Sequence, residues 1–208
     1  MMHILLIIIS VSFTLAFVET ESDNNYYRKS DTSERNFVEK NDSTPNSIED
    51  LSKFIIKGYE ILDSVHTDIN ENNIEDVILV LKMKGEDTIP SESIRPVLLL
   101  RRNNNGILSL ARQNDSTVYC YSCGGIMGDP YIGIFSKNGI FTIQHYGGSA
   151  WRWSREITFK YSKNEDEWFL HKVYSDSFHA SDYENIDSTV TTDKVFEKVK
   201  FEDYNIYK

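Results

Sequence analysis

An acidic, asparagine-rich stretch between Asp68 and Asp76 carries the residues best suited to bind a metal ion. A hard cation such as calcium takes about six to eight oxygen ligands, which a tight loop supplies from alternate residues and a backbone carbonyl. The spacing therefore predicts a weak calcium site, although an acidic turn without metal is the alternative. The expected ligands are the side-chain oxygens of Asp68, Asn70, Asn72 and Asp76 and the carbonyl oxygen of Ile74.

The run TDINENNIEDVILVL, from Thr67 to Leu81, resembles the calcium loop of FG-GAP/VCBS-type repeats, the blades of integrin-α-like β-propellers. In that family the loop joins two strands, and the five matched positions bind the ion. Ile69 would then point inward as an apolar anchor. The family usually has Gly at the sixth loop position, where Asn73 also tolerates a left-handed φ. Only one such loop occurs here, so the resemblance does not imply a complete propeller.

An EF-hand is excluded, because the twelfth loop position is Leu79 instead of Glu and the flanking segments have strand patterns.

A second group of residues that could bind a ligand lies in a glycine-rich segment. Seven of the ten glycines fall between Gly124 and Gly148, and such clustering indicates tight turns or close backbone approach. Aromatic rings beside charged groups are typical of sugar- or peptide-binding surfaces. The alternative is a core position, because His145 alternates with Phe141 and Ile143. The candidate ligand-binding residues are Asp129, His145, Tyr146, Trp151, Arg152 and Trp153.

The segment from Cys120 to Tyr161, which pairs CGGxxGDP with HYGGSxWRW, resembles exported bacterial proteins of uncharacterised function. This resemblance implies export and no particular activity.

Cys120 and Cys123 are the only cysteines. Such a pair can be a disulfide, a redox pair or half of a metal site. Further zinc ligands are missing nearby, and Gly-Gly follows where a thioredoxin-type motif would open a helix. We expect a short structural disulfide; two free thiols are the alternative.

No G-x-S-x-G, H-E-x-x-H or phosphate-binding loop occurs in the chain. The first hypothesis is therefore a calcium-stabilised, non-enzymatic β module that binds a protein or glycan partner or serves at the cell envelope. The second is a hydrolase or carbohydrate-active protein, which needs Asp129, His145 or Glu156 to converge within hydrogen-bond reach. The third is a periplasmic inhibitor or immunity-type protein, which an acidic surface would suit.

The charge balance excludes two classes of partner. The chain has 22 Lys and Arg against 32 Asp and Glu, a formal net charge of −10. A surface this negative repels nucleic acid and anionic lipid, so we expect neither as a partner. We also expect a monomer.

The apolar run Ile4–Phe17 predicts a signal peptide over residues 1–20, because it is shorter than the roughly 20 residues that span a bilayer. An uncleaved anchor is the alternative, and the positive charge that usually precedes such a run is weak. Export implies a periplasmic or extracellular protein. Residues 21–46 are polar and without apolar period, which predicts a disordered linker.

Residues 47–208 read as a single, mainly β domain with one short helix, Ser47–Lys57. The period then changes to two, which predicts about seven to nine antiparallel strands arranged as a meander, a sandwich or a partial propeller. Asn105-Gly106 and Asn138-Gly139 favour hairpins with primed turns. His179–Asp193 reads as a polar loop and Lys194–Tyr207 as a final strand. The other predicted strands are Tyr59–His66, Glu75–Lys84, Arg95–Arg102, Ile107–Arg112, Tyr131–Ser136, Ile140–His145, Trp151–Tyr161 and Trp168–Tyr174.

Overall fold

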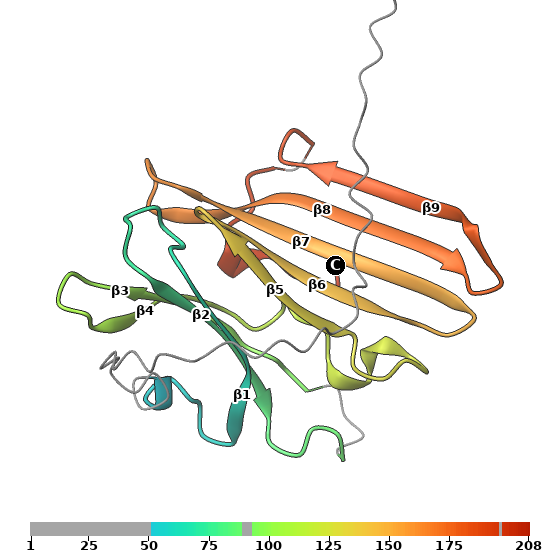
Figure 1. Cartoon of the computed structure of the whole chain (residues 1–208), viewed down its shortest axis with the longest axis horizontal. Helices are drawn as coiled ribbons and strands as arrows, with labels where there is room; N and C mark the ends of the chain where they lie inside the picture. Colours follow the sequence, from blue (N-terminus) through green and yellow to red (C-terminus); the bar gives the residue numbers. More distant parts are fainter. Residues whose placement is uncertain (1–50, 89–92, 196) are drawn as a thin grey trace, which may run out of the picture. The chain divides into compact units, whose positions relative to one another are not determined.

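The computed structural model describes residues 51–88, 93–195 and 197–208, and its strands form two antiparallel sheets (Figure 1). The predicted mainly β, antiparallel fold is confirmed: 55% of the described residues lie in strands, and they form no closed barrel. The predicted signal peptide and linker lie outside the described residues. The strands are β1 (Tyr59–Thr67), β2 (Asp76–Met83), β3 (Val97–Arg102), β4 (Leu108–Asn114), β5 (Tyr131–Lys137), β6 (Ile140–Gly148), β7 (Trp151–Ser162), β8 (Glu167–His179) and β9 (Asp182–Thr192).

The first sheet, ordered β1-β2-β3-β4, is apolar on both faces. Ile78 and Val80 belong to a core shared with the second sheet, whereas Leu79 and Leu81 pack on the opposite face with Leu51. This explains why β2 and β3 are continuous apolar runs, since a strand covered on both faces has no polar side.

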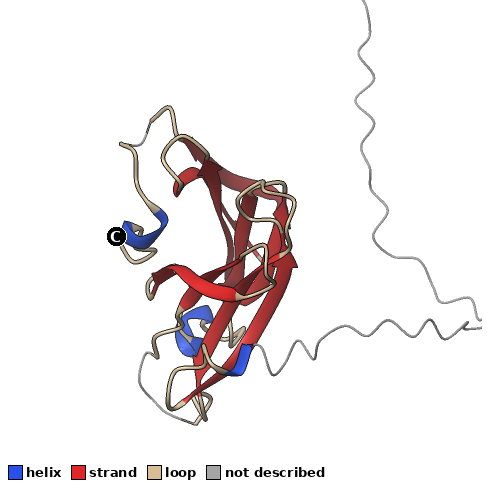
Figure 2. Ribbon diagram, turned by 90° about the vertical axis from the view of Figure 1, so that its left-hand side faces the viewer, coloured by secondary structure: helices blue, strands red, loops and turns tan. Residues whose placement is uncertain are grey.

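The second sheet, ordered β5-β6-β7-β8-β9, alternates between a core face and an outer face. Phe141 on β6 and Phe159 on β7 stack with ring centroids 5.3 Å apart, and the Phe201 ring lies against both. The two sheets meet along β1 and β5, where the Tyr131 hydroxyl donates to Asp63 at 2.8 Å. Figure 2 shows the strands of both sheets in an edge view.

The prediction of a polar loop at His179–Asp193 is wrong, because most of this segment forms strand β9. Its side chains are exposed on both faces from Asp182 to Val190, so no buried side imposes an apolar alternation. Pairing with β8 holds the strand instead, with Tyr174 opposite Val190 and Asp176 opposite Ser188.

The predicted final strand Lys194–Tyr207 is also wrong. Residues 197–208 contain one isolated bridge, between Phe169 and Lys200, and a short 3-10 helix, η2 (Phe201–Asp203). Phe201, Tyr204 and Ile206 enter the shared core without forming a strand.

The predicted helix Ser47–Lys57 is too long at its carboxyl end. Leu51 and Ser52 are helical, but Phe54 then donates to the Leu51 carbonyl in an i→i+3 turn; residues 47–50 lie outside the described part.

Both predicted hairpins are present. Asn138 and Gly139 have φ of 50° and 71°, as a primed turn requires. In the other hairpin the Asn103 carbonyl accepts the Gly106 amide in a longer turn, and Gly106 has a positive φ whereas Asn105 does not. The primed turn predicted at Asn105-Gly106 is therefore wrong.

Among the described residues, no helix is long and apolar enough to cross a membrane.

Candidate functional site

The Asp68–Asp76 loop joins β1 to β2 and is folded around the Asp68 carboxylate. Its Oδ1 accepts the amides of Asn70 (3.2 Å) and Asn72 (3.1 Å), and its Oδ2 accepts the amide of Asn73 (2.6 Å). Asn72 Oδ1 accepts the amide of Ile74 at 2.8 Å. Asn73 has a φ of 64°, the left-handed conformation expected at the sixth loop position. The side-chain oxygens of Asp68 and Asn72 therefore point toward backbone amides of the same loop.

Asp76 closes the loop as a fully buried carboxylate. Its Oδ1 accepts the Arg102 amide (2.7 Å) and its Oδ2 the Ile69 amide (3.3 Å). Burial raises the pKa of Asp76; these two amides lower it, and the negative charge of Asp68 raises it further. A bound cation would offset both the burial penalty and the repulsion between the two carboxylates. The two carboxylates, two carboxamides and backbone carbonyl form an all-oxygen donor set that suits calcium.

Asn70 lies between these carboxylates in the sequence and is 3% exposed. Its Oδ1 accepts the Asn72 amide at 3.2 Å, whereas its Nδ2 is buried and meets no hydrogen-bond partner. This nitrogen is a donor, so it lacks an acceptor; a cation would bind the Oδ1 of Asn70 and would leave its Nδ2 unsatisfied.

The same loop is attached to the second sheet. The Trp168 indole Nε1 donates to the Ile69 carbonyl at 2.8 Å, and the Gly139 amide donates to the Asp68 carbonyl at 3.2 Å. Ile69 itself is 1% exposed and lies in the shared core, as an inward anchor should. Any ligand that orders this loop would therefore also stabilise the junction between the sheets.

Within residues 51–88, 93–195 and 197–208, no group of three or more His, Cys, Asp or Glu side chains is placed to hold a metal ion. Of the four carboxylates in the loop, only Asp68 and Asp76 are among the predicted ligands, so a calcium site here would need carboxamide and carbonyl oxygens as its other donors.

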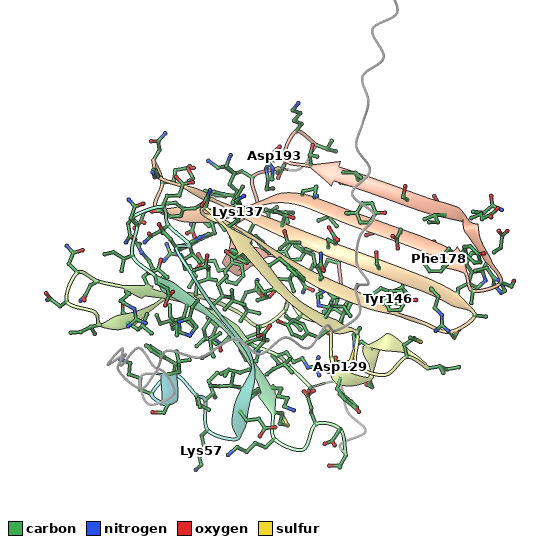
Figure 3. All side chains as sticks on the ribbon, viewed as in Figure 1. Lys57, Asp129, Lys137, Tyr146, Phe178 and Asp193 are labelled. Atoms are coloured by element: carbon green, nitrogen blue, oxygen red, sulfur yellow. A yellow bond between two sulfur atoms is a disulfide. The ribbon has the colours of Figure 1, made fainter. Side chains whose placement is uncertain are left out.

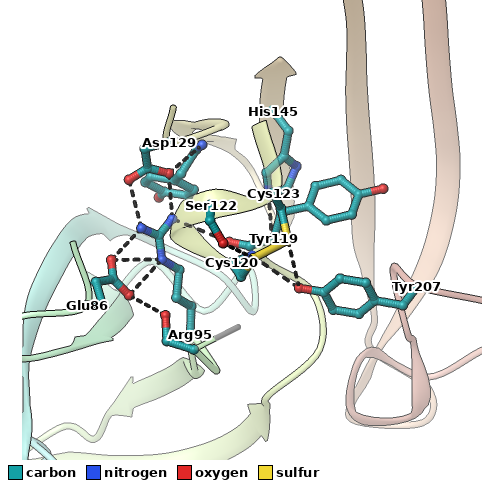
Figure 4. The surroundings of a disulfide bond; sticks show 11 residues. Glu86, Arg95, Tyr119, Cys120, Ser122, Cys123, Asp129, His145 and Tyr207 are labelled. Carbon is teal, nitrogen blue, oxygen red and sulfur yellow. Dashed lines mark hydrogen bonds and ion pairs between the residues drawn. A yellow bond between two sulfur atoms is a disulfide. The ribbon is translucent and has the colours of Figure 1, made fainter. Parts of the chain in front are cut away.

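Near the glycine-rich segment, Asp129 is engaged by a buried arginine (Figure 4). Arg95 is fully buried and donates to Asp129 through Nη1 (2.6 Å) and Nη2 (2.7 Å). On its other side Arg95 Nε donates to Glu86 at 3.1 Å, and Ser93 also donates to Glu86. Sequence reasoning missed this network, because Arg95 reads as the polar start of the predicted strand Arg95–Arg102. Asp129 therefore serves a buried ion network.

The Cys120–Cys123 disulfide is present, with the two Cα atoms 5.1 Å apart. It lies beside the carboxyl-terminal segment, where the Tyr207 hydroxyl accepts the Cys120 amide at 3.1 Å (Figure 4). The predicted disulfide is thus confirmed.

His145 is a core residue with 1% exposure. Its Nε2 accepts the Tyr119 amide at 3.4 Å, and its ring meets those of Tyr119 and Tyr131 edge to face. Burial, followed by the positive charge of Arg155, lowers the pKa of His145 to about 3. The imidazole is therefore neutral at physiological pH.

The other predicted ligand-binding residues are divided between two sheet faces. Cross-strand pairs place Tyr146 with Ser154 and Arg152 with Phe178 on the outer face, opposite His145 and its neighbours; Figure 3 labels Tyr146 and Phe178 there. Trp153 lies on the inner face, 5.4 Å from the Tyr119 ring. Trp151 is 64% exposed. The structure does not gather the six predicted residues around one cavity.

The three residues of the hydrolase hypothesis are also separated. Glu156 accepts from Gln144 Nε2 at 2.9 Å on the outer face, His145 faces the core, and Asp129 binds Arg95. None of the hydrogen bonds of these three residues links the histidine to either carboxylate.

A histidine–carboxylate pair does occur at a different place, which the sequence analysis missed. His171 Nδ1 lies 2.6 Å from Asp193 Oδ2, beside a cavity of about 440 Å³. His171 is the extra residue of a β-bulge, since Phe159 pairs with Leu170 and Thr158 with Lys172. The two residues are 22 positions apart, so only the pairing of β8 with β9 brings them together. The cavity is lined by Lys160, Tyr161, Ser162, Phe169, Leu170, His171, Asp193, Glu197 and Lys198.

No protein-family model matches the chain, and neither the characterised proteins nor the solved structures contain a match.

Proposed function

We propose that this chain is an exported, non-enzymatic β module with a binding role, and that calcium in the Asp68–Asp76 loop stabilises it. The main support for this proposal is the buried Asp76 carboxylate at the end of the loop. The Asp68 carboxylate, which accepts the Asn70 amide, faces the same loop backbone. A calcium ion there would balance the two negative charges. It would also fix a loop that joins two strands of the first sheet and contacts the second sheet through Gly139 and Trp168.

Two further features support export. The first is the short apolar run Ile4–Phe17. The second is the Cys120–Cys123 disulfide, since disulfides persist mainly in oxidising compartments. Millimolar calcium is available outside the cytoplasm, so a site with a Kd in the range of about 10⁻⁴–10⁻³ M would still be occupied there.

Calcium should raise the stability of the full chain. Ligand that binds only the folded state stabilises by RT ln(1 + [L]/Kd), so ~1 mM calcium on a site with a Kd of about 10⁻⁴–10⁻³ M should add about 0.4–1.4 kcal/mol. Urea unfolding in millimolar calcium and in chelator measures the difference, and titration calorimetry gives the Kd. Asp76→Asn keeps the side-chain shape but removes one of the two charges, so it should remove most of the calcium effect.

Glu71→Gln is the matched control, because Glu71 lies in the same loop and pairs with Lys163 at 3.0 Å on the surface. It should retain the calcium response. A wild-type chain whose stability is the same in calcium and in chelator would show that the loop is an ordinary turn, and the proposal would fail.

A further inference from the structure

Strand β9 is the open edge of the second sheet. It is 11 residues long and pairs only with β8; no described residue pairs with its other side. Edge strands are usually protected by Lys, Pro, strong bulges or short length, because their free amides and carbonyls accept another strand. β9 contains neither Lys nor Pro, and its side chains from Asp182 to Val190 are exposed. A bulge interrupts its pairing with β8 between Asp182 and Asp187, whereas Asp187–Thr192 pair in regular register. The regular part of the edge is therefore guarded by acidic charge, which disfavours an acidic strand but not a basic one.

The side chains of β9 indicate the kind of strand that fits. Its charged residues are Asp182, Glu184 and Asp187, with no basic residue among them. Asp182 accepts from Asn185 at 2.8 Å, whereas Glu184 and Asp187 form no ion pair with any described residue. On the same strand, the side chains of Ile186 and Val190 are 53% and 57% exposed. The strand thus offers unpaired negative charge and apolar surface next to free main-chain groups.

We propose that the free edge of β9 binds an extended, basic polypeptide segment as an additional strand of the second sheet. Main-chain hydrogen bonds would supply affinity, and the alternate Lys or Arg side chains of the partner that share a face with Asp187 would pair with it. A second copy of this chain fits less well, because pairing two β9 edges would bring two acidic strands together. The inference names a partner class for the binding role and is independent of the calcium loop.

The test uses the full chain and an eleven-residue fluorescent peptide of alternating Lys and Thr, in chelator. Fluorescence anisotropy should show saturable binding that weakens as salt is added. Asp187→Lys should raise the Kd at least about tenfold, since it replaces an attraction by a repulsion. Asp115→Lys makes the same charge change at an exposed turn and should leave the Kd unchanged.

Two N-methylated peptides separate strand pairing from general charge attraction. One is methylated at the odd residues and the other at the even residues, so only one of them loses the amides that face β9. One peptide should lose binding and the other should keep it. Equal binding of both, equal effects of Asp115→Lys and Asp187→Lys, or no binding would overturn the proposal. Concentration-dependent dimers of the chain in sedimentation would assign the edge to a second copy and would overturn it as well.

Discussion

Arg95 is a fully buried positive charge, and its ion pairs connect Glu86 with Asp129. Burial alone would lower its pKa, but the hydrogen bonds that it donates to Asp129 and Glu86 raise the pKa overall. A buried charge is tolerated only when it is paired and its donors are satisfied. The Tyr119 carbonyl accepts a further hydrogen bond from Arg95 Nη1 at 3.3 Å. One side chain thus joins the loop before β3 to the segment around the disulfide.

Glu86→Ala should destabilise the protein by about 3 kcal/mol, because it removes one partner of a buried charge. Urea unfolding measures the difference. The control is Glu60→Ala, which breaks the half-exposed ion pair between Glu60 and Lys82 (3.3 Å) and should cost less than about 1 kcal/mol. Equal losses for the two variants would show that the Arg95 network contributes no more than a surface pair.

At the scale of elements, the glycines of β6 let two segments approach closely. A Cβ at Gly147 would lie 2.6 Å from the Trp153 ring and 2.9 Å from the Gly124 Cα. Gly148 bridges to Gly125, so β6 contacts the disulfide segment along its backbone. The sequence predicted close approach here from glycine clustering, but it did not predict the partner.

Gly147→Ala should destabilise by about 1–3 kcal/mol, because the added methyl group must displace a packed ring and backbone. Gly128→Ala is a useful comparison, since a Cβ there meets nothing within 4 Å and only its φ of +81° is unfavourable. The backbone strain in Gly128→Ala should cost about 1–2 kcal/mol of stability. This variant should leave the surroundings of Trp153 unchanged. Trp153 fluorescence should therefore change in Gly147→Ala alone; an unchanged spectrum there would mean that the ring and backbone are not in close contact.

The elements also show what the sequence can predict. Strands β1 to β8 are recognisable because an apolar run or an apolar alternation faces the core, as in Val77–Leu81 and Ile157–Phe159. β9 has no buried face, so only its pairing with β8 defines it. The same limit applies to sites. The Asp68–Asp76 loop is local and can be read from nine consecutive residues, whereas the Arg95–Asp129 and His171–Asp193 pairs depend on tertiary contacts.

At the scale of the whole molecule, the shared core draws on both sheets and on the carboxyl-terminal segment. His145 lies at one end of it, next to Tyr119 and Tyr131, and is neutral in the folded protein. In the unfolded chain its pKa returns to about 6.5. Below that pH the unfolded state binds a proton that the folded state does not, so His145 favours unfolding in acid.

Between about pH 6 and pH 3 this difference should reduce stability by up to about 1.4 kcal/mol per pH unit, and the loss ends near the folded pKa of about 3. His145→Gln removes the titrating group, so its unfolding free energy should fall less steeply over that range than that of the wild type. Ile143→Val, which weakens the same strand by about 1 kcal/mol without removing a titratable group, should keep the wild-type slope. Urea unfolding at several pH values in chelator compares the three proteins. A His145→Gln slope equal to that of Ile143→Val would mean that acid opens the molecule elsewhere. Asp76 does not account for the wild-type slope in the same way, because burial raises the pKa of its carboxyl group and its protonation in acid favours the folded state.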